Sequence, residues 1–147
     1  MTKKYKVVID TNIFIQGWFY GNSNCQTILK LIRDNKIYLG FSQDSIGELL
    51  YVTKNFARKF IDDKNDRLKT LNYISKLFYY GSSVNIADMD DVSEIKDKTD
   101  LMFVQCAIGY NADFIISNDY KSGMFDVSQY SFNVLSAEDF IELINEI

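Results

Sequence analysis

The stretch VVIDTNIF, residues 7–14, holds the pattern that decides the fold. Three branched apolar residues run without alternation and stop at a carboxylate, Asp10. An unbroken apolar run of this kind is typical of a strand buried on both faces, as in a parallel sheet covered by helices. The acid at its end has two interpretations: it caps the helix that follows, or it stands at the mouth of a site.

Strand and helix patterns alternate along the rest of the chain. Strands are predicted at residues 5–10, 37–41, 83–86, 113–117 and 131–135, the last of them at a sheet edge. Helices are predicted at residues 24–36, 43–55, 64–78, 100–109 and 137–147, with N-caps at Ser23 or Asn24, at Ser42 and at Ser136. This alternation predicts an α/β fold, a three-layer α/β/α sandwich around a mostly parallel sheet. The length of 147 residues fits one domain, residues 1–147.

The composition excludes several kinds of chemistry. The chain has no histidine, which rules out Ser-His-Asp and Cys-His catalysis, and it has no glycine-rich phosphate loop. Its two cysteines, Cys25 and Cys106, are too few for a four-thiolate zinc site and are predicted to be reduced, partly buried thiols. No apolar run approaches the roughly 18 residues that span a bilayer, and no signal peptide is recognisable, so we expect a cytoplasmic protein without a membrane partner.

Carboxylates are therefore the main candidates for chemistry. Asp10 and Asp119 follow predicted buried strands, so both are expected at the carboxyl edge of the sheet, where such folds bind ligands. Asp100 begins a predicted helix, and Glu48 lies within another whose neighbouring residues are apolar. Each acid also has a simpler interpretation, as a helix cap, a turn residue or a solvent-facing helix residue. If they converge, their mutual repulsion calls for a cation, and oxygen ligands suit Mg²⁺ or Mn²⁺.

Charge is distributed unevenly although the net charge is only −4. Residues 53–76 hold seven Lys and Arg against three Asp, whereas residues 86–100 hold six acids against two Lys. The basic helical segment at about 53–78 is a candidate track for a polyanion, with Lys54, Arg58 and Lys59 as candidate RNA contacts. The alternative is that both segments are solvated faces.

Four motifs in order resemble the PIN-domain nucleases, which include the toxin ribonucleases of bacterial toxin–antitoxin pairs. They are VVIDTNIFI at residues 7–15, SQDSIGEL at 42–49, TDLMFVQCA at 99–107 and ADFIISND at 112–119. The resemblance covers residues 5 to about 140. Asp100 keeps a fixed spacing to Ala107, and the strand that follows ends in a serine two residues before Asp119. The order and spacing of all four motifs make the resemblance specific.

This resemblance implies an α/β/α sandwich and a metal-dependent endoribonuclease. It assigns metal-binding and catalytic roles to Asp10, Glu48, Asp100 and Asp119, with one or two Mg²⁺ or Mn²⁺ ions. It gives Asn12 and Ser117 supporting roles through hydrogen bonds. The implied substrate is single-stranded RNA, and the toxin relatives imply an antitoxin partner and a homodimer.

The sequence departs from the family pattern at two places. The loop before the third acid reads DKTD, residues 97–100, where many relatives have a proline, so Asp97 competes with Asp100 as a ligand. The threonine expected before the fourth acid is Ser117, which keeps the hydroxyl group. We favour Asp100 as the ligand because it alone keeps the spacing to Ala107, and Asp97 stays a candidate for site support.

Two other functions fit parts of the pattern. One is a catalytically inactive PIN-like module that binds RNA or protein. The other is a phosphatase of the haloacid dehalogenase type, which also places an aspartate after its first strand. That chemistry normally uses a second carboxylate two residues later, and this position holds Asn12.

Overall fold

A five-stranded parallel sheet forms the centre of the protein in a computed structural model, which describes residues 3–92, 95–127 and 130–145. The strands are β1 Lys6–Ile9, β2 Tyr38–Ser42, β3 Ser82–Val84, β4 Phe114–Ile116 and β5 Asn133–Leu135, in the order β3-β2-β1-β4-β5. Every neighbouring pair is parallel. The predicted parallel sheet and the edge position of β5 are confirmed.

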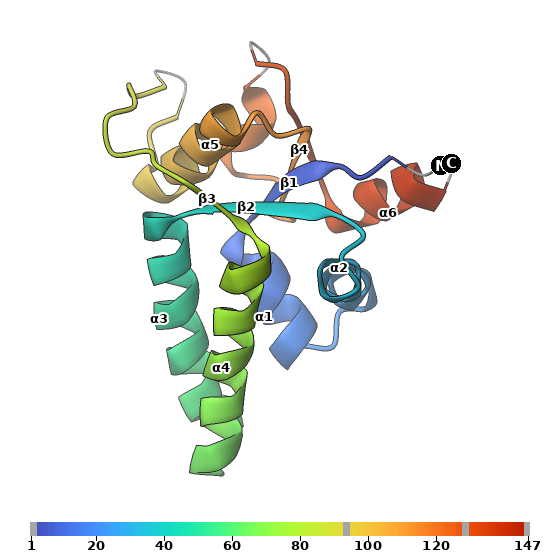
Figure 1. Cartoon of the computed structure of the whole chain (residues 1–147), viewed down its shortest axis with the longest axis vertical. Coiled ribbons are helices and arrows are strands. Elements are labelled where there is room, and N and C mark those ends of the chain that lie inside the picture. The colour runs from blue at the N-terminus through green and yellow to red at the C-terminus, as the bar shows by residue number, and fades with distance from the viewer. Residues whose placement is uncertain (1–2, 93–94, 128–129, 146–147) are drawn as a thin grey trace.

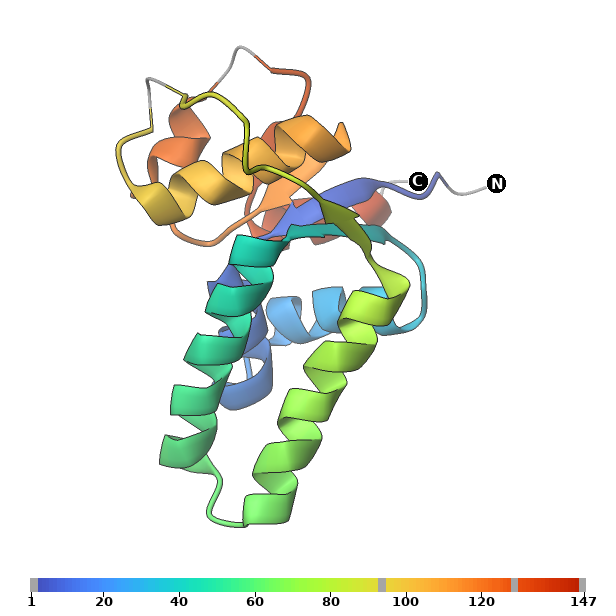
Figure 2. The same cartoon turned by 60° about the vertical axis from the view of Figure 1, so that its left-hand side comes forward.

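Helices cover both faces of this sheet. They are α1 Thr11–Phe19, α2 Ser23–Arg33, α3 Gln43–Phe60, α4 Lys64–Tyr80, α5 Lys98–Tyr110 and α6 Ala137–Asn145, with a short 3₁₀ helix, η1, at Gly123–Asp126. In Figures 1 and 2, α5 lies on one side of the sheet and α1 and α2 lie on the other. The predicted three-layer α/β/α sandwich is therefore confirmed.

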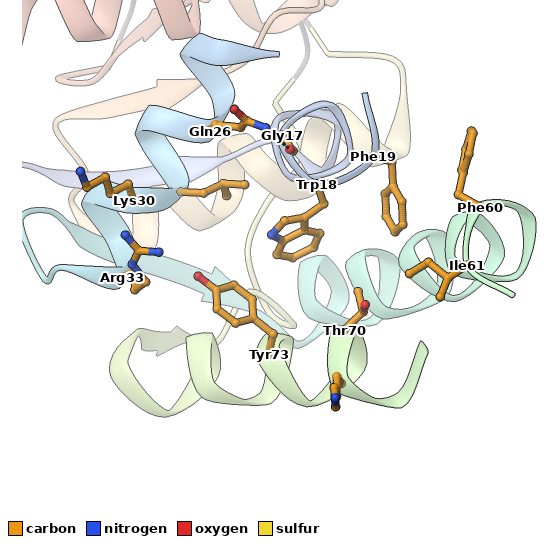
Figure 3. Close-up of a pocket in the computed structure, with 12 residues that line it drawn as sticks. Gly17, Trp18, Phe19, Gln26, Lys30, Arg33, Phe60, Ile61, Thr70 and Tyr73 are labelled. Carbon is orange, nitrogen blue, oxygen red and sulfur yellow. Dashed lines mark hydrogen bonds between the residues drawn. The ribbon is translucent and has the colours of Figure 1, made fainter. Parts of the chain in front are cut away.

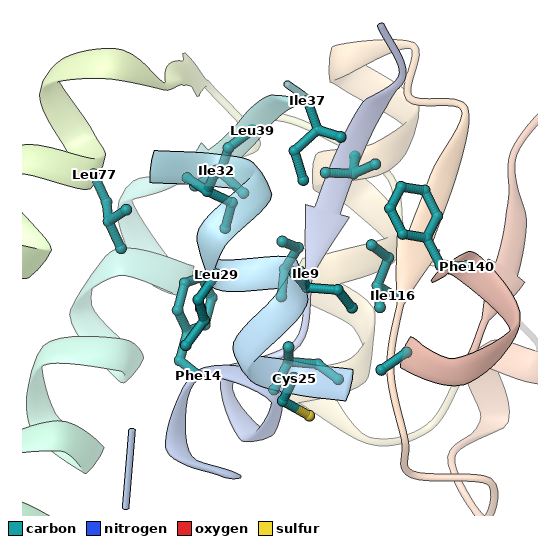
Figure 4. Packing of buried hydrophobic residues seen from close by; sticks show 14 of the residues in the cluster. Ile9, Phe14, Cys25, Leu29, Ile32, Ile37, Leu39, Leu77, Ile116 and Phe140 are labelled. Carbon is teal, nitrogen blue, oxygen red and sulfur yellow. The ribbon is translucent and has the colours of Figure 1, made fainter. Parts of the chain in front are cut away.

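Two hydrophobic clusters, one on each face, explain the unbroken apolar run of β1. Val7 and Ile9 point into a cluster with α1, α2, α4 and α6, which Figure 4 shows from close by. Val8 points the other way, into a cluster with α5 and η1. All three side chains are at most 5% exposed, because β1 occupies the middle of the sheet. Burial on both faces is what removes the usual alternation from its sequence.

The helix after β1, α1, had no predicted bounds. Its sequence, TNIFIQGWF, is apolar nearly all round, and buried side chains occur at both consecutive and spaced positions. The helix packs against both α2 and α3, and its two outer polar residues, Asn12 and Gln16, are too few to reveal a 3.6-residue period. A helix enclosed in this way cannot be distinguished from a buried strand by periodicity alone.

Several predicted bounds need correction. The N-cap of α2 is Asn22, whose side chain accepts a hydrogen bond from the Cys25 amide, rather than Ser23 or Asn24. Helix α3 continues to Phe60 rather than ending near residue 55, and β3 ends at Val84 rather than at residue 86. Ser42 does cap α3. The last two residues of the predicted helix 137–147 lie outside the described residues.

Helices α3 and α4 form an antiparallel hairpin, here called the helical arm, residues 43–80. In Figures 1 and 2 the two helices lie side by side and extend away from the sheet. Asp63 caps α4 after a turn of three residues by accepting from the amides of Asn65 and Asp66. The predicted basic segment at 53–78 thus lies on this arm. In the part of the chain that the structure describes, no helix is both long and apolar enough to cross a membrane.

Candidate active site

The carboxyl ends of β1 and β4 place Asp10 and Ser117 side by side. The Asp10 amide donates to the carbonyl of Ile116 at 3.0 Å, which extends the pairing of the two strands by one residue. Ser117 then donates its hydroxyl hydrogen to Asp10 Oδ2 at 2.8 Å. Ser117 is fully buried and Asp10 is 9% exposed, so this hydrogen bond is shielded from water. Two central strands therefore fix the first carboxylate.

Burial raises the pKa of the Asp10 carboxyl from 3.8 to about 6. The hydrogen bond from Ser117 and the amide of Asn12 lower the pKa, while the negative charges of Glu48 and Asp100 raise it further. Asp10 occupies the N-cap position of α1, but its side chain makes no capping hydrogen bond. The interpretation of Asp10 as a helix cap therefore rests on the Asn12 amide alone, whose approach lowers the pKa of the carboxyl. The Asn12 side chain is exposed, and the contact that this residue makes with the Asp10 carboxyl is through its backbone amide.

A threonine in the first turn of α1 holds the Glu48 carboxylate. Thr11, which is 6% exposed, donates its hydroxyl hydrogen to Glu48 Oε2 at 2.7 Å. Glu48 itself is half-buried on α3, and its charge reaches Asp10. Thr11 was not predicted as a site residue. Its hydroxyl group next to Asp10 was the available signal, but only the packing of α1 against α3 brings it to Glu48.

Asp97 and Asp100 have different roles at the start of α5. Asp97 is the N-cap, and its Oδ1 accepts from the amides of Thr99 at 2.8 Å and Asp100 at 3.2 Å. Asp100 lies in the first helical turn and is half-buried. Helix α5 therefore begins at Lys98, two residues before the predicted start.

The Asp100 carboxyl faces the loop that follows Asp119. Burial raises the pKa of Asp100, and the charges of Asp97 and Asp119 raise it further. The hydroxyl of Ser122 and the amide of Gly123 favour the charged form and lower the pKa. Ser122 is a second site residue that was not predicted. Its contribution depends on the turn that brings residue 122 back toward α5.

Asp119 lies in the loop between β4 and η1 and is exposed. Its amide donates to Ser117 Oγ at 3.1 Å, so one serine hydroxyl contacts both the first and the fourth acid of the motif set. Asp119 Oδ1 accepts from the Lys121 amide at 3.3 Å, and its carbonyl accepts from the Ser122 amide at 3.0 Å. These bonds define the turn, while the carboxylate stays accessible.

The acids thus lie in a row of interacting charges. Asp10 interacts with Glu48 and Asp100, and Asp100 interacts with Asp119. Within residues 3–92, 95–127 and 130–145, no three acid or cysteine side chains are already arranged around a cation position. Mg²⁺ commonly keeps several waters and takes only one or two carboxylates directly, so this open set of oxygen donors still fits a hydrated cation.

Comparison with known proteins gives the family. A PIN-domain family model matches residues 6–121, a span that contains all four acids. The chain belongs to the PIN-domain family. Membership of this family supports nuclease activity for the chain. No curated protein sequence matches the chain.

Two solved structures resemble this PIN domain in fold. The first is described as VapBC2 from Rickettsia felis bound to a DNA fragment from their promoter; its matching chain has a TM-score of 0.58 and 16% identity, over 89% of this chain and 98% of that chain. The second is PAE2754 from Pyrobaculum aerophilum, with a TM-score of 0.64 and 11% identity, over 98% of this chain and 91% of that chain. At these identities the likeness shows the fold alone.

The PIN domain also has a groove of about 780 Å³, lined by residues of α1, α2 and α4 and the end of α3. Figure 3 shows Trp18, Phe19 and Tyr73 at this groove, with Lys30 and Arg33 beside it. None of the four acids of the candidate site lines it. The groove is therefore a feature separate from the acid site.

The predicted RNA contacts, Lys54, Arg58 and Lys59, are exposed on the last turns of α3. Arg58 is ten residues beyond Glu48, which corresponds to about 15 Å along a helix. Phe56, on the same turns of α3, packs against Phe19 with ring centroids 5.8 Å apart. The cations are thus accessible on the arm, while this aromatic side chain is used in packing.

Proposed function

We propose that this PIN domain, residues 1–147, is a metal-dependent endoribonuclease whose acids are Asp10, Glu48, Asp100 and Asp119. The observation that carries the proposal is the Asp10 carboxylate, which is 9% exposed and faces the charges of Glu48 and Asp100. Such a cluster stores repulsion that a divalent cation relieves. The family membership supplies the nuclease class, and the absence of histidine is compatible with metal-assisted hydrolysis.

Each residue has a distinct part in this proposal. Asp10 and Asp119 hold one or two Mg²⁺ or Mn²⁺ ions at the carboxyl edge of the sheet, with Asp100 and Glu48 completing the set. A bound cation supplies an activated water and neutralises charge on the phosphodiester. Ser117 keeps the Asp10 oxygen oriented by donating to it, and Thr11 does the same for Glu48.

Replacement of Asp10 by asparagine tests the assignment. Wild-type protein is expected to cleave single-stranded RNA with Mg²⁺ or Mn²⁺, and Asp10→Asn is expected to lose this cleavage and to bind Mn²⁺ at least tenfold more weakly in calorimetry. Unchanged cleavage would remove Asp10 from the site. Absence of both Mn²⁺ binding and cleavage in the wild type would favour the alternative, an inactive PIN-like module that binds RNA or protein.

The choice between Asp97 and Asp100 has a separate test. Asparagine caps a helix about as well as aspartate, so Asp97→Asn keeps the start of α5. If Asp100 is the ligand, Asp100→Asn abolishes cleavage while Asp97→Asn retains most of it. Loss of Mn²⁺ binding in Asp97→Asn with intact helix content would instead make Asp97 a ligand.

RNA is proposed to approach along the exposed cations of the helical arm. The double reversal Arg58→Glu, Lys59→Glu is expected to weaken binding of single-stranded RNA and to reduce its salt dependence, by about 0.7 in slope per lost phosphate contact. Lys36→Glu serves as the control, because Lys36 is also exposed but lies just before β2, away from the carboxyl edge. An identical salt slope in the double variant would refute this track.

A partner protein is proposed for the groove. Its charged lining residues are Lys30, Arg33 and Lys69, and no acid occurs among the residues that the structure gives as its lining. The pairs Arg33–Asp34 and Lys69–Asp66, at 3.5 and 3.8 Å, are exposed and contribute little. An apolar floor with a basic rim fits an acidic amphipathic segment, such as an antitoxin supplies.

The partner protein to test is the one encoded by an adjacent reading frame. Its binding is expected to weaken at least tenfold with Arg33→Glu and to remain with Lys36→Glu. Equal binding by both variants would remove the groove from the interface.

Two further properties stay predictions. Light scattering would test for a homodimer, and fluorescence microscopy would test for a cytoplasmic location. The exposed amide of Asn12 gives no support to phosphatase chemistry, which needs a carboxylate there.

A further inference from the structure

Asn118 lies between two residues of the candidate site but is not itself one of its acids. Its neighbour Ser117 contacts Asp10, and its other neighbour is Asp119. The Asn118 side chain joins two helices: Oδ1 accepts from the amide of Ala137 at 2.9 Å, and Nδ2 donates to Cys25 Sγ at 3.5 Å. Ala137 is the first residue of α6, and Cys25 is a fully buried residue of α2.

These two contacts require a carboxamide. One end of the side chain must accept a hydrogen bond and the other must donate one, which neither aspartate nor an apolar residue can do. The amide at the start of α6 is one of the donors that lack a partner within the helix, so Asn118 supplies an acceptor that the helix needs. The loop after β4 is thereby attached to two helices that belong to the hydrophobic cluster below the sheet.

We propose that Asn118 is a positioning residue of the acid site, and that it fixes the loop 117–119 so that Ser117 and Asp119 keep their places relative to Asp10. The inference rests on the proposed nuclease function. Ser117 Oγ donates to Asp10 Oδ2 and accepts from the Asp119 amide, so both bonds depend on one backbone placement. Without the anchors on α2 and α6, the loop rotates and the two carboxylates no longer share a fixed geometry.

Three variants test this role. Asn118→Ala removes both contacts, and Asn118→Asp keeps an acceptor for the Ala137 amide while losing the donor to Cys25. Ser136→Ala is the matched control, because Ser136 also caps α6, by accepting from the Asp139 amide at 3.1 Å, but makes no contact with the loop 117–119 among the described hydrogen bonds. All three are compared with wild type at a temperature well below their Tm.

The first measurement uses metal-free protein and needs no catalysis. Hydrogen exchange of the Asp119 amide is expected to accelerate at least tenfold in Asn118→Ala, which loses both anchors, to accelerate less in Asn118→Asp, which keeps the α6 anchor alone, and to be unchanged in Ser136→Ala. Wild-type exchange in Asn118→Ala, or equal acceleration in the two Asn118 variants, would overturn the proposal.

The second measurement separates positioning from a general loss of stability. Asn118→Ala is expected to weaken Mn²⁺ binding about tenfold or more and to lower kcat with little change in KM, as outer residues of a metal site typically do. Ser136→Ala is expected to lower Tm without either effect. Equal Mn²⁺ affinity in wild type and Asn118→Ala would overturn the positioning role, whereas a wild type that binds no Mn²⁺ and cuts no RNA would instead refute the proposed function.

Discussion

Burial of the Asp10 charge, together with its repulsion by Glu48 and Asp100, predicts that removing this charge stabilises the metal-free protein. Burial raises the pKa of Asp10 from 3.8 to about 6. A shift of this size corresponds to about 3 kcal/mol, at about 1.4 kcal/mol for each pKa unit. Asparagine keeps the shape and still accepts the hydrogen bond from Ser117, so Asp10→Asn loses the penalty and retains the contact. At pH 7.5 we expect a gain of about 1–3 kcal/mol and a rise in Tm on the order of 5 °C.

The sign of the effect follows from proton binding. The folded pKa of Asp10 lies above the unfolded one, so the folded protein binds more protons between about pH 4 and pH 6. The wild-type free energy of unfolding therefore loses this contribution as the pH rises through that window, whereas Asp10→Asn has no such loss. The difference between the two proteins should be full above about pH 7 and should vanish near pH 4.

Urea unfolding in EDTA, measured from pH 4 to pH 8, tests this reasoning. Asp88→Asn, at an exposed loop acid, serves as the control and should leave the stability unchanged at each pH. Adding Mg²⁺ should stabilise the wild type by mass action and leave Asp10→Asn nearly unaffected. Equal stability of wild type and Asp10→Asn at pH 7.5, or a difference independent of pH, would refute the account of Asp10 as a repelled, desolvated charge.

The remaining predictions concern single contacts. Thr11→Val removes the hydroxyl that donates to Glu48 at nearly constant shape, and should weaken Mn²⁺ binding about tenfold in calorimetry; equal affinity would contradict an orienting role. Gly40→Ala would place a methyl group 2.3 Å from the ring of Tyr110 and should destabilise by about 1–3 kcal/mol in urea unfolding. Gly47→Ala, with open space around it inside α3, should instead stabilise by about 0.5–1 kcal/mol, and a loss there would show that the helix needs its glycine.

In the hairpin of α3 and α4, the local sequence pattern predicted the start of α3 correctly but not its full length. The Ser42 cap was predicted, and the structure adds its reciprocal partner: Ser42 Oγ accepts from the Ser45 amide at 3.1 Å, and Ser45 Oγ accepts from the Ser42 amide at 2.9 Å. The end of α3 was predicted near residue 55, too early, since its last turns pack through Phe56 and Phe60 against Phe19 of α1. Tertiary contact extends a helix beyond the point at which its own pattern weakens.

The sequence by itself determined the central strand, the alternation of strands and helices, and the order of the four acids. Each of these depends on residue type and local period, which a linear chain records directly. The family match over residues 6–121 agrees with the motifs from which the PIN resemblance was inferred.

Only the tertiary structure decided which polar groups meet. Ser117 and Asp10 are 107 positions apart, and their hydrogen bond exists because β1 and β4 pair in one register. The contacts of Thr11 with Glu48 and of Asn118 with Ala137 likewise depend on how helices pack on the sheet. A local pattern records how deeply a residue is buried, but the partner of a buried polar group is set by elements distant in the chain. For that reason the acids and Ser117 were recognised in the sequence, while Thr11, Ser122 and Asn118 were not.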